Sequence, residues 1–261
     1  MTGPTETHRT DAGAVAGIPP GTRAMIFAAG LGTRLKPFTE NHPKALAPVN
    51  GKPLLQRNIE YLLRYGVRDI IVNVHHFADQ VVSFLERNDG FGASIEVSHE
   101  EPAPLETGGG LVKASWFLEQ AAGPFLVMNA DILTDLDLTA IYRDHLTHRP
   151  IATLAVTRRR SSRVLLFDDR MVLSGWQNLS SGERRISREG VAPLHPLAFT
   201  CVHVIEPAML AQIRQQGVFS IIETYLDLAR RTEIRGFDHD GDRVVDVGRP
   251  ESILEAERLF P

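Results

Sequence analysis

The 261-residue chain has a formal net charge of -4, with 43% hydrophobic and 23% charged residues. This composition excludes an intrinsically disordered chain and argues against a nucleic-acid-binding protein, which needs a basic surface. The single cysteine, Cys201, cannot form an internal disulfide, and no apolar run reaches the roughly 20 residues of a bilayer span. We therefore expect a cytoplasmic protein without membrane or nucleic-acid partners.

Residues 1–22 differ in composition from the rest of the chain. The stretch MTGPTETHRTDAGAVAGIPPGT has neither helical nor strand periodicity, and it lacks the basic start and apolar stretch of a secretory signal. We expect a flexible N-terminal tail over residues 1–22 and a single domain over residues 23–261.

From residue 24, short apolar runs alternate with amphipathic segments, which is the pattern of βα units around a mainly parallel sheet. The predicted strands cover residues 24–29, 69–74, 93–98, 124–131, 151–157 and 197–205. The predicted helices cover residues 53–66, 77–88, 111–121, 136–146, 206–217 and 220–231, and a final strand turns into a helix over residues 243–260. The fold class is therefore α/β.

The chain changes character at about residues 158–195, where three arginines, an Asp-Asp pair and scattered glycines interrupt the pattern. The apolar segments 162–167 and 171–176 predict short antiparallel strands. We expect this stretch to be a small insertion or flap on the main sheet.

The segment directly after the first predicted strand is rich in groups that bind phosphate. Gly30 and Gly32 let backbone N–H groups approach a polyphosphate, while Arg34 offers paired hydrogen bonds and Lys44 a compact charge. A dinucleotide-binding G-x-G-x-x-G motif needs a third glycine where Leu35 stands, which disfavours a nicotinamide-dependent oxidoreductase. A plain glycine turn with solvated cations is also disfavoured, because these residues occur together after a buried strand.

Two aspartates follow buried apolar runs. Asp131 lies at the carboxyl end of the predicted strand over residues 124–131, and Asp246 has the same placement in RVVDVG. Ligands of open α/β sheets bind at the carboxyl ends of strands. Either aspartate alone is explained as well by a cap on the following helix or loop, but together with the phosphate loop they indicate a Mg²⁺ site.

Residues 30–39 and 43–49 match a long signature, G-x-G-[TS]-R-L-x-P-[LF]-T followed by P-K-[AP]-[LM]-x-P-[VI]. On these residues the chain resembles the sugar-1-phosphate nucleotidyltransferase family, and the resemblance extends to LETGGG, NADILTD, LAFTCVHVI and VVDVGRPE. It implies a Rossmann-like three-layer α/β/α fold with a mixed, mainly parallel central sheet. It also implies Mg²⁺-dependent, in-line attack of a sugar 1-phosphate on the α-phosphorus of a nucleoside triphosphate, giving a nucleotide-sugar and pyrophosphate.

The same resemblance implies roles for individual residues. The triphosphate is held by Ala29, Gly30, Leu31, Gly32, Thr33 and Arg34. Lys44 stabilises charge near the α-phosphate, Asp131 and Asp246 ligate the metal, and the catalytic residues are Arg34, Lys44 and Asp131. The base and ribose lie along the loop that carries Glu100, Thr107, Gly108 and Gly109. For Thr107 a cap on the following helix is the alternative.

The resemblance leaves the base and the sugar open. Glu100 resembles the guanylyl branch of the family, whereas LETGGG resembles N-acetylmuramate-1-phosphate uridylyltransferases, so the nucleotide is UTP or GTP. Ala130 stands where many members have glycine. Cys201 does so as well, which places a side chain where the sugar approaches.

Many members use a lysine of a central E-K-P segment to bind the sugar phosphate, but every lysine of this chain precedes residue 114. The role then falls to an arginine. The candidates are Arg158, Arg159, Arg160, Arg163 and Arg249, and for the first three a solvated charge run is the alternative. The competing function is a catalytically silent nucleotide-sugar-binding regulatory protein of the same fold. The joint presence of the catalytic and metal-binding residues favours the enzyme.

Overall fold

A computed structural model describes residues 17–190 and 193–261 of the chain. The α-helices are α1 (Leu54–Arg64), α2 (Ala78–Arg87), α3 (Glu106–Lys113), α4 (Ser115–Leu118), α5 (Leu138–His148), α6 (Ile221–Leu228) and α7 (Pro250–Leu259), and the 3-10 helices are η1 (Phe38–Glu40), η2 (Lys44–Leu46), η3 (Asp89–Gly92) and η4 (Pro207–Gln212). The strands are β1 (Arg23–Phe27), β2 (Pro48–Val49), β3 (Lys52–Pro53), β4 (Asp69–Val74), β5 (Ser94–His99), β6 (Phe125–Asn129), β7 (Ile132–Thr134), β8 (Ala152–Thr157), β9 (Arg163–Phe167), β10 (Leu173–Asn178), β11 (Arg184–Ile186), β12 (His195–Ile205), β13 (Ile234–Asp238) and β14 (Val244–Asp246). Most of the predicted tail, residues 1–16, lies outside the described residues, whereas Ile18 is buried against the core.

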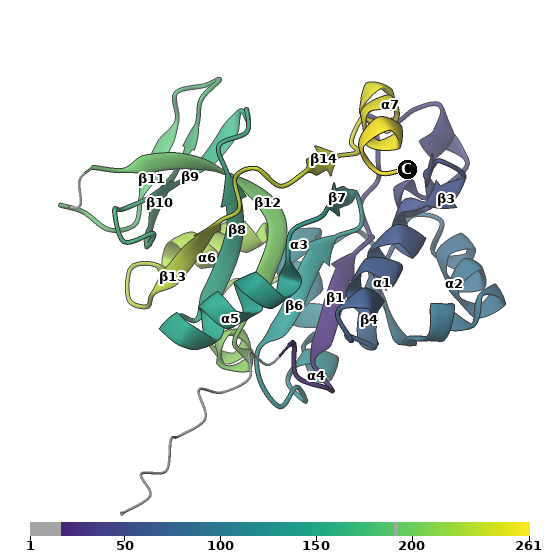
Figure 1. Ribbon diagram of the computed structural model, residues 1–261, viewed down its shortest axis with the longest axis horizontal. Helices are drawn as coiled ribbons and strands as arrows, with labels where there is room; N and C mark the ends of the chain where they lie inside the picture. Colours follow the sequence, from purple (N-terminus) through teal and green to yellow (C-terminus); the bar gives the residue numbers. More distant parts are fainter. Residues whose placement is uncertain (1–16, 191–192) are drawn as a thin grey trace, which may run out of the picture.

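One mixed sheet runs through the molecule (Figure 1). Its strand order is β11-β10-β9-β12-β6-β1-β4-β5, and β8 pairs with both β12 and β13. β5, β4, β1 and β6 are parallel neighbours, whereas β12 lies antiparallel to both β6 and β8. The predicted fold class, an α/β domain with a mixed central sheet and an antiparallel insertion, is confirmed.

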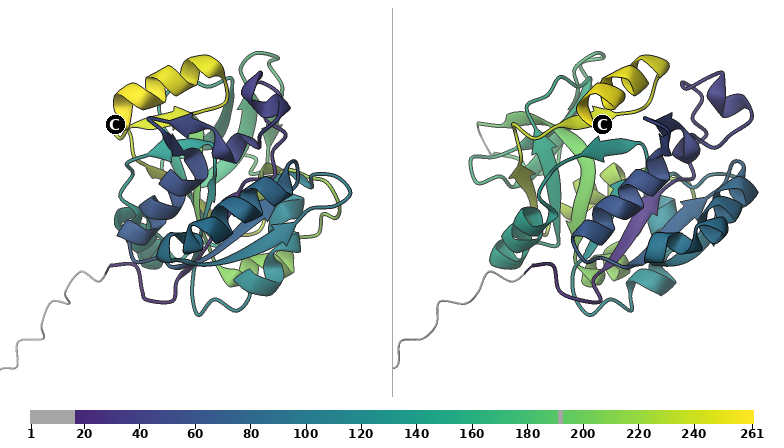
Figure 2. Two further views of the ribbon diagram at one scale, coloured as in Figure 1. Left: turned by 90° about the vertical axis from the view of Figure 1, so that its right-hand side faces the viewer. Right: turned by 45° about the vertical axis from the view of Figure 1, so that its right-hand side comes forward.

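Helices cover both faces of this sheet, because alternate residues of each strand point to opposite sides. On β1, Ala24 and Ile26 belong to a core with α1, α2 and α5, whereas Met25 and Phe27 belong to a second core with α3, α4 and α6. Figures 1 and 2 show α1, α2 and α5 on one face and α3 and α6 behind the strands. The three-layer arrangement therefore follows from near-continuous apolar strands buried on both faces.

A third, smaller core packs residues 245–256 against Leu133 and residues 35–54. Residues of α7, β14 and β7 pack there with Val49 and Leu54. Arg243 reinforces this contact, since its Nε donates to Asp135 Oδ2 at 2.6 Å and its guanidinium lies 5.1 Å from the Phe260 ring centroid. The C-terminal helix thus fixes β14 beside β7 (Figure 1).

The insertion predicted for residues 158–195 forms the antiparallel strands β9, β10 and β11. Both predicted strands are present, and β9 pairs with β12 through Leu165↔Leu197 and Leu166↔Pro196. The insertion is therefore hydrogen-bonded to the main sheet and extends it.

Helix α3 differs from the predicted helix over residues 111–121, because it begins at Glu106 and runs through three glycines. Glycine disfavours helix by about 1 kcal/mol relative to alanine, which is why the sequence pattern predicts a loop there. Close packing overrides that preference: an added Cβ would lie 2.2 Å from the Phe219 ring at Gly108 and 2.3 Å from the Gly217 carbonyl oxygen at Gly109. The helix then ends early, and α4 follows as a separate short turn.

Three further differences concern element type and boundary. The predicted helix over residues 206–217 is only the 3-10 helix η4, and strand β13 was not predicted. Helix α5 begins at residue 138, two residues later than predicted, because the Asp137 side chain accepts from Thr139 N at 2.8 Å and caps it.

Two buried histidines are held neutral by the core. His203 on β12 is hydrogen-bonded to the Tyr225 hydroxyl, and burial lowers the pKa of His203 to about 3. His145 on α5 lies with Nδ1 2.9 Å from Thr153 Oγ1, and burial lowers the pKa of His145 to about 4. In the unfolded chain both rings titrate near pH 6.5. Below that pH, the unfolded chain binds protons that the folded chain does not.

We predict that the free energy of unfolding falls as the pH drops below about 6.5, with each of the two histidines contributing up to about 1.4 kcal/mol per pH unit. Above about pH 7.5 both rings are neutral in both states and contribute no slope. The measurement is urea unfolding of the parent and of His203→Gln at about pH 7.5, 6.5 and 5.5. The variant should show the shallower pH dependence, and equal slopes in the two proteins would contradict the assignment.

Candidate active site

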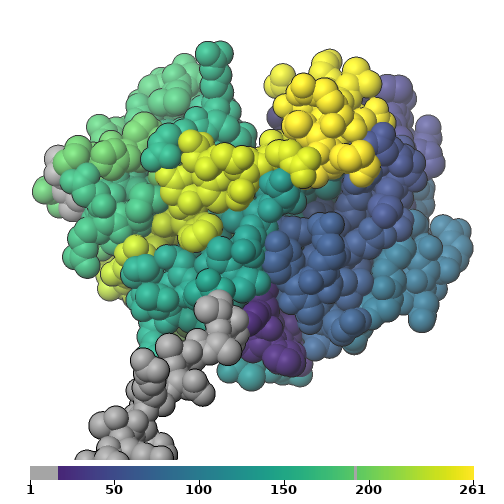
Figure 3. Space-filling view, viewed as in Figure 1, coloured from purple at the N-terminus to yellow at the C-terminus, as the bar shows by residue number. Residues whose placement is uncertain are grey.

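A cavity of about 450 Å³ lies at the carboxyl ends of β1 and β6, near β14 and α7. Figure 3 shows this end of the molecule notched between the insertion strands and α7. The predicted site residues that line the cavity are Ala29, Gly30, Leu31, Gly32, Thr33, Arg34, Lys44, Glu100, Thr107 and Asp131. Segments far apart in the sequence therefore meet in one place, as expected for the carboxyl edge of an open α/β sheet.

The first loop closes tightly around Gly32. Its φ of +64° lies in the left-handed region, and an added Cβ would lie 2.8 Å from Thr39 Cγ2 and 2.9 Å from Lys44 Cβ. The Thr39 hydroxyl donates to the Gly32 carbonyl at 2.9 Å. At Gly30, by contrast, an added Cβ would meet nothing within 4 Å. Gly32 therefore shapes the loop, while Gly30 keeps the cavity side of it open.

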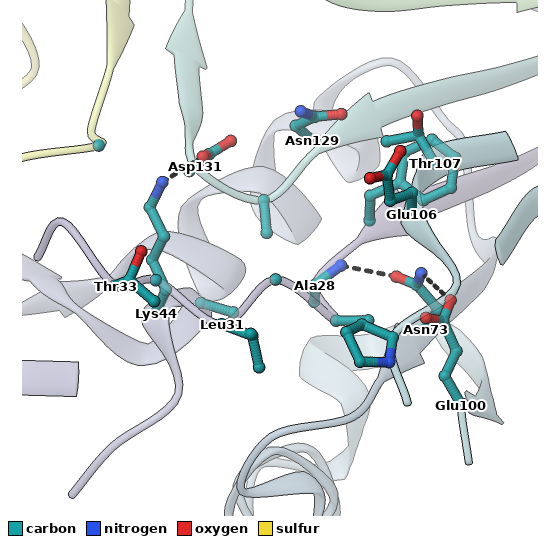
Figure 4. Close-up of a pocket in the computed structure, with 18 of the residues that line it drawn as sticks. Ala28, Leu31, Thr33, Lys44, Asn73, Glu100, Glu106, Thr107, Asn129 and Asp131 are labelled. Carbon is teal, nitrogen blue, oxygen red and sulfur yellow. Dashed lines mark hydrogen bonds and ion pairs between the residues drawn. The ribbon is translucent and has the colours of Figure 1, made fainter. Parts of the chain in front are cut away.

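Asp131 and Asp246 are brought together by strand pairing. β7 and β14 are antiparallel with Ile132 opposite Asp246, and the Val247 N–H donates to the Asp131 carbonyl at 2.8 Å. The Lys44 ammonium forms an ion pair with the Asp131 carboxylate (Figure 4). Asp246 is not a lining residue of the cavity, but its β-strand partner directly follows Asp131.

The two carboxylates repel each other, and cations surround them. Withdrawal from water on the protein side, followed by the Asp131 charge, raises the pKa of Asp246, whereas Lys44, Arg34 and Arg159 lower it. Asp246 remains open to solvent on its other side. Gly248 lies close to both this carboxylate and Arg34, because an added Cβ there would lie 2.9 Å from Asp246 Oδ1 and 3.2 Å from Arg34 Nη2.

This donor set fits a hard divalent cation. Mg²⁺ binds through one or two carboxylates and completes its shell with water and substrate phosphates. In the described part of the chain no group of three or more His, Cys, Asp or Glu side chains could hold a metal ion, which argues against a closed structural zinc site. Burial and then the neighbouring Asp131 charge raise the pKa of Asp246, and a bound cation would favour its ionised form.

The far end of the cavity contains a polar group that the sequence analysis missed. Asn73, at the end of β4, accepts from the Ala28 N–H and donates to the Glu100 carboxylate, both at 2.7 Å (Figure 4). Glu100 also accepts from the Leu105 N–H at 2.7 Å. A signal was available, because Asn73 is the only amide side chain in the apolar strand DIIVNV and stands near its carboxyl end. Asn129, at the end of β6, lines the cavity and was also missed.

Some residues of the LETGGG segment line the cavity, and others pack against the segment before α6. Thr107 lines the cavity, and its hydroxyl accepts from the Ile221 N–H at 3.0 Å, so it caps α6 and not its own helix. Gly108 and Gly109 do not line the cavity. Their N–H groups donate to the Phe219 carbonyl at 2.9 and 3.3 Å, which gives these two glycines a packing role between α3 and the segment before α6.

The returning strand β12 passes near the two carboxylates, although its residues are not among those that line the cavity. Cys201 lies where the β12–β8 register shifts, and its φ of +56° is left-handed, a conformation that favours glycine. Enclosure of the thiol, followed by the charges of Asp131 and Asp246, raises the pKa of Cys201 to about 12. Cys201 is therefore a neutral side chain beside the carboxylate pair.

Among the candidate arginines, Arg159 is distinct. Its Nη2 donates to the Phe199 carbonyl at 3.1 Å, and its buried Nε has no hydrogen-bond partner within the described residues. Arg158 instead pairs with Asp238 at 2.7 Å. The others, Arg160, Arg163 and Arg249, are exposed.

Comparisons with known proteins show the family and the fold of the chain. The family model described as "Nucleotidyl transferase" matches residues 23–164. The N-acetylmuramate alpha-1-phosphate uridylyltransferase of Caulobacter vibrioides is 32% identical over 245 residues, which cover 90% of this chain and 95% of that protein. The mannose-1-phosphate guanylyltransferase catalytic subunit beta of Drosophila melanogaster is 27% identical over 244 residues, which cover 92% of this chain and 63% of that protein. The chain thus spans less than two thirds of this second relative.

Solved structures share the fold. HddC from Yersinia pseudotuberculosis in complex with GMP-PN superposes with a TM-score of 0.73 at 22% identity, covering 92% of this chain and all of that one. A UDP-glucose pyrophosphorylase complexed with UDP-glucose gives a TM-score of 0.71 at 17% identity over 92% of this chain and 98% of the other. The chain belongs to the nucleotidyl transferase family. Among the described residues, no helix has the length and apolar character needed to cross a bilayer.

We predict that Asp131→Asn weakens binding of Mn²⁺, used as a spectroscopic substitute for Mg²⁺, by about tenfold or more, because it removes one of two carboxylate charges and releases Lys44 beside the other. Electron paramagnetic resonance titration of free Mn²⁺ measures this. Asp137→Asn is the control, since asparagine still caps α5 and the residue lies outside the cavity. Equal Mn²⁺ affinity in the Asp131 variant and the parent would remove Asp131 from the metal site.

Proposed function

We propose that this protein transfers a nucleoside monophosphate from a nucleoside triphosphate to a sugar 1-phosphate, releasing pyrophosphate, with Mg²⁺ as cofactor. The observation that carries the proposal is the placement of the Gly30–Arg34 loop, Lys44 and Asp131 at one cavity, with Asp246 on the strand paired beside Asp131. Membership of the nucleotidyl transferase family and the names of the relatives support it. A silent regulatory protein would not need all of these groups.

Each group has a chemical task in this reaction. Backbone N–H groups of residues 30–34 and the Arg34 guanidinium bind and orient the triphosphate. Lys44, held by Asp131, offsets the negative charge that accumulates at the α-phosphate during in-line attack. Asp131 and Asp246 would hold Mg²⁺, which when bound neutralises phosphate charge.

We assign the sugar phosphate to Arg159. A buried Nε without a partner indicates a donor that awaits an anion, and the guanidinium is close enough to Asp246 and Cys201 to influence both. Cys201 would then contact the sugar, where glycine would leave more room. This assignment places the two phosphate-bearing substrates on opposite sides of the carboxylate pair.

UTP with N-acetylmuramate α-1-phosphate is the first substrate pair to test, because the relative with that name aligns over 95% of its own length. GTP with mannose 1-phosphate is the second, since the relatives with that activity in their names align over less of theirs. A product of the first pair would place the enzyme in cytoplasmic synthesis of a cell-envelope sugar.

We expect pyrophosphate release only with a divalent metal, since the site brings two carboxylates toward a polyphosphate. The experiment crosses the four nucleoside triphosphates with a panel of sugar 1-phosphates, with Mg²⁺ or with EDTA. Turnover with one pair, abolished by EDTA and restored by Mg²⁺, supports the proposal. Full activity in chelated, metal-free enzyme would contradict the role of the aspartates, and no turnover with any pair would contradict the function.

We predict that Arg159→Met raises the KM for the sugar 1-phosphate by about tenfold or more and leaves the KM for the triphosphate nearly unchanged, because a charged hydrogen bond is worth about 1.5–3 kcal/mol. Steady-state kinetics with each substrate varied in turn measures this. The matched control is Arg158→Met, which removes a guanidinium already paired with Asp238. A similar change in both variants, or in the KM for the triphosphate alone, would contradict the assignment.

A further inference from the structure

Asn73 and Glu100 form a buried chain of three hydrogen bonds. The Ala28 N–H donates to Asn73 Oδ1, Asn73 Nδ2 donates to Glu100 Oε1, and the Leu105 N–H donates to Glu100 Oε2, each at 2.7 Å. The pairing of β4 with β5 brings the two side chains together, with the Glu100 N–H donating to the Val74 carbonyl at 2.8 Å. Both ends of the chain are backbone groups, so it links two separate stretches of main chain.

These two stretches are the two halves of the nucleotide site. Ala28 directly follows β1 and precedes the phosphate-binding loop at residues 29–34. Leu105 precedes α3, and its neighbours Pro104 and Glu106 line the cavity. The side chains of Asn73 and Glu100 therefore set the distance between the phosphate loop and the loop over residues 100–107 (Figure 4).

Close packing leaves little freedom for other arrangements. Asn73 is 2% exposed and Glu100 is 1% exposed. An added Cβ on Gly110 of α3 would lie 2.5 Å from Glu100 Oε1 and 2.8 Å from Asn73 Nδ2. In the described residues Glu100 has no ion-pair partner, so hydrogen bonds are what offset the burial of its carboxylate.

The two terminal N–H groups restrict which side chains can stand between them. Both termini donate, so the two side chains must supply three acceptor contacts and one donor contact, which one amide and one carboxylate provide. Two amides leave two donors facing each other, and two carboxylates leave two acceptors facing each other. Aspartate at 73 with glutamine at 100 satisfies all three bonds again, with the direction of the central bond reversed.

We infer that Asn73 and Glu100 are a positioning pair that fixes the distance between the phosphate-binding loop and the loop over residues 100–107, so that both contact the nucleoside triphosphate. In this arrangement the loop over residues 100–107 contacts the base, and the Glu100 carboxylate does not. The inference rests on the proposed function, because it names the part of that site that fixes the nucleotide. It predicts that triphosphate affinity requires one amide and one carboxylate at positions 73 and 100, whichever of the two positions carries the carboxylate.

The test is a swap of amide and carboxylate in the full chain. Glu100→Gln and Asn73→Asp should each weaken triphosphate binding by about 10- to 100-fold, because each leaves a mismatched buried pair. The double variant, Asn73→Asp with Glu100→Gln, should bind within about threefold of the parent. Calorimetric titration with UTP and with GTP gives both the affinity and the ratio between the two bases, and that ratio should be the same in the double variant as in the parent.

A second swap gives a matched control. Gln56 Nε2 donates to Glu60 Oε1 at 2.8 Å on α1, outside the cavity, so Gln56→Glu with Glu60→Gln exchanges the same groups and should leave nucleotide affinity unchanged. Melting temperatures are recorded for every variant. If Asn73→Asp fails to fold, Glu100→Gln and the double variant still test the inference. The inference predicts that the double variant folds, because all three hydrogen bonds are restored in it.

Several results would overturn the inference. A double variant that binds no better than Glu100→Gln, that loses the parent's base ratio, or that does not fold would show that Glu100 itself contacts the base or that the pair is not exchangeable. Parent affinity in Glu100→Gln would also overturn it. A parent that binds no triphosphate would instead refute the proposed function, so the two failures are distinguishable.

Discussion

The pairing of β7 with β14, which brings the carboxylates Asp131 and Asp246 together, is the constraint around which the site is arranged. Backbone pairing of β7 with β14 holds the two groups near each other regardless of their charges. Cations surround the pair: Lys44 forms an ion pair with Asp131, and the charges of Lys44, Arg34 and Arg159 favour the ionised form of Asp246. In the proposed function, Mg²⁺ with its bound phosphates would supply further positive charge to the two carboxylates.

The reversal of strand direction at β12 places two kinds of segment at one edge of the sheet. The strands on one side of β6 are parallel, and their carboxyl ends supply the first loop and Asn73. β12 enters antiparallel, so its first half extends past the end of β6 toward the insertion, and it carries Cys201 there. In the proposed function, the loops that follow the parallel strands would bind the nucleotide, and the strand that approaches them would face the acceptor.

The sequence predicted the features that depend on local pattern. The apolar run Asp69–Val74 is a strand at the predicted bounds, Ala152–Thr157 begins one residue later than predicted, and the family resemblance is confirmed. Most of the predicted nucleotide-binding residues line one cavity, while their roles in binding and catalysis stay predictions. What the pattern could not provide are contacts made across the fold. A helix through Gly108 and Gly109 depends on Phe219 and Gly217, which lie more than a hundred residues away. The positioning role proposed for Asn73 depends on its hydrogen bond to Glu100, which directly follows the neighbouring strand β5.

The order of residues along the chain has a consequence for biosynthesis. Asp246 belongs to β14, which α7 and Arg243 secure, and all of these come from the last stretch of the polypeptide. A nascent chain on the ribosome can already form the phosphate loop, the parallel strands and Asp131, since folding proceeds from the N-terminal side during synthesis. It has only one of the two carboxylates until residue 246 has emerged. The carboxylate pair is therefore complete only after β14 has been synthesised, and a product terminated before β14 would keep the first loop and Asp131 without the second carboxylate.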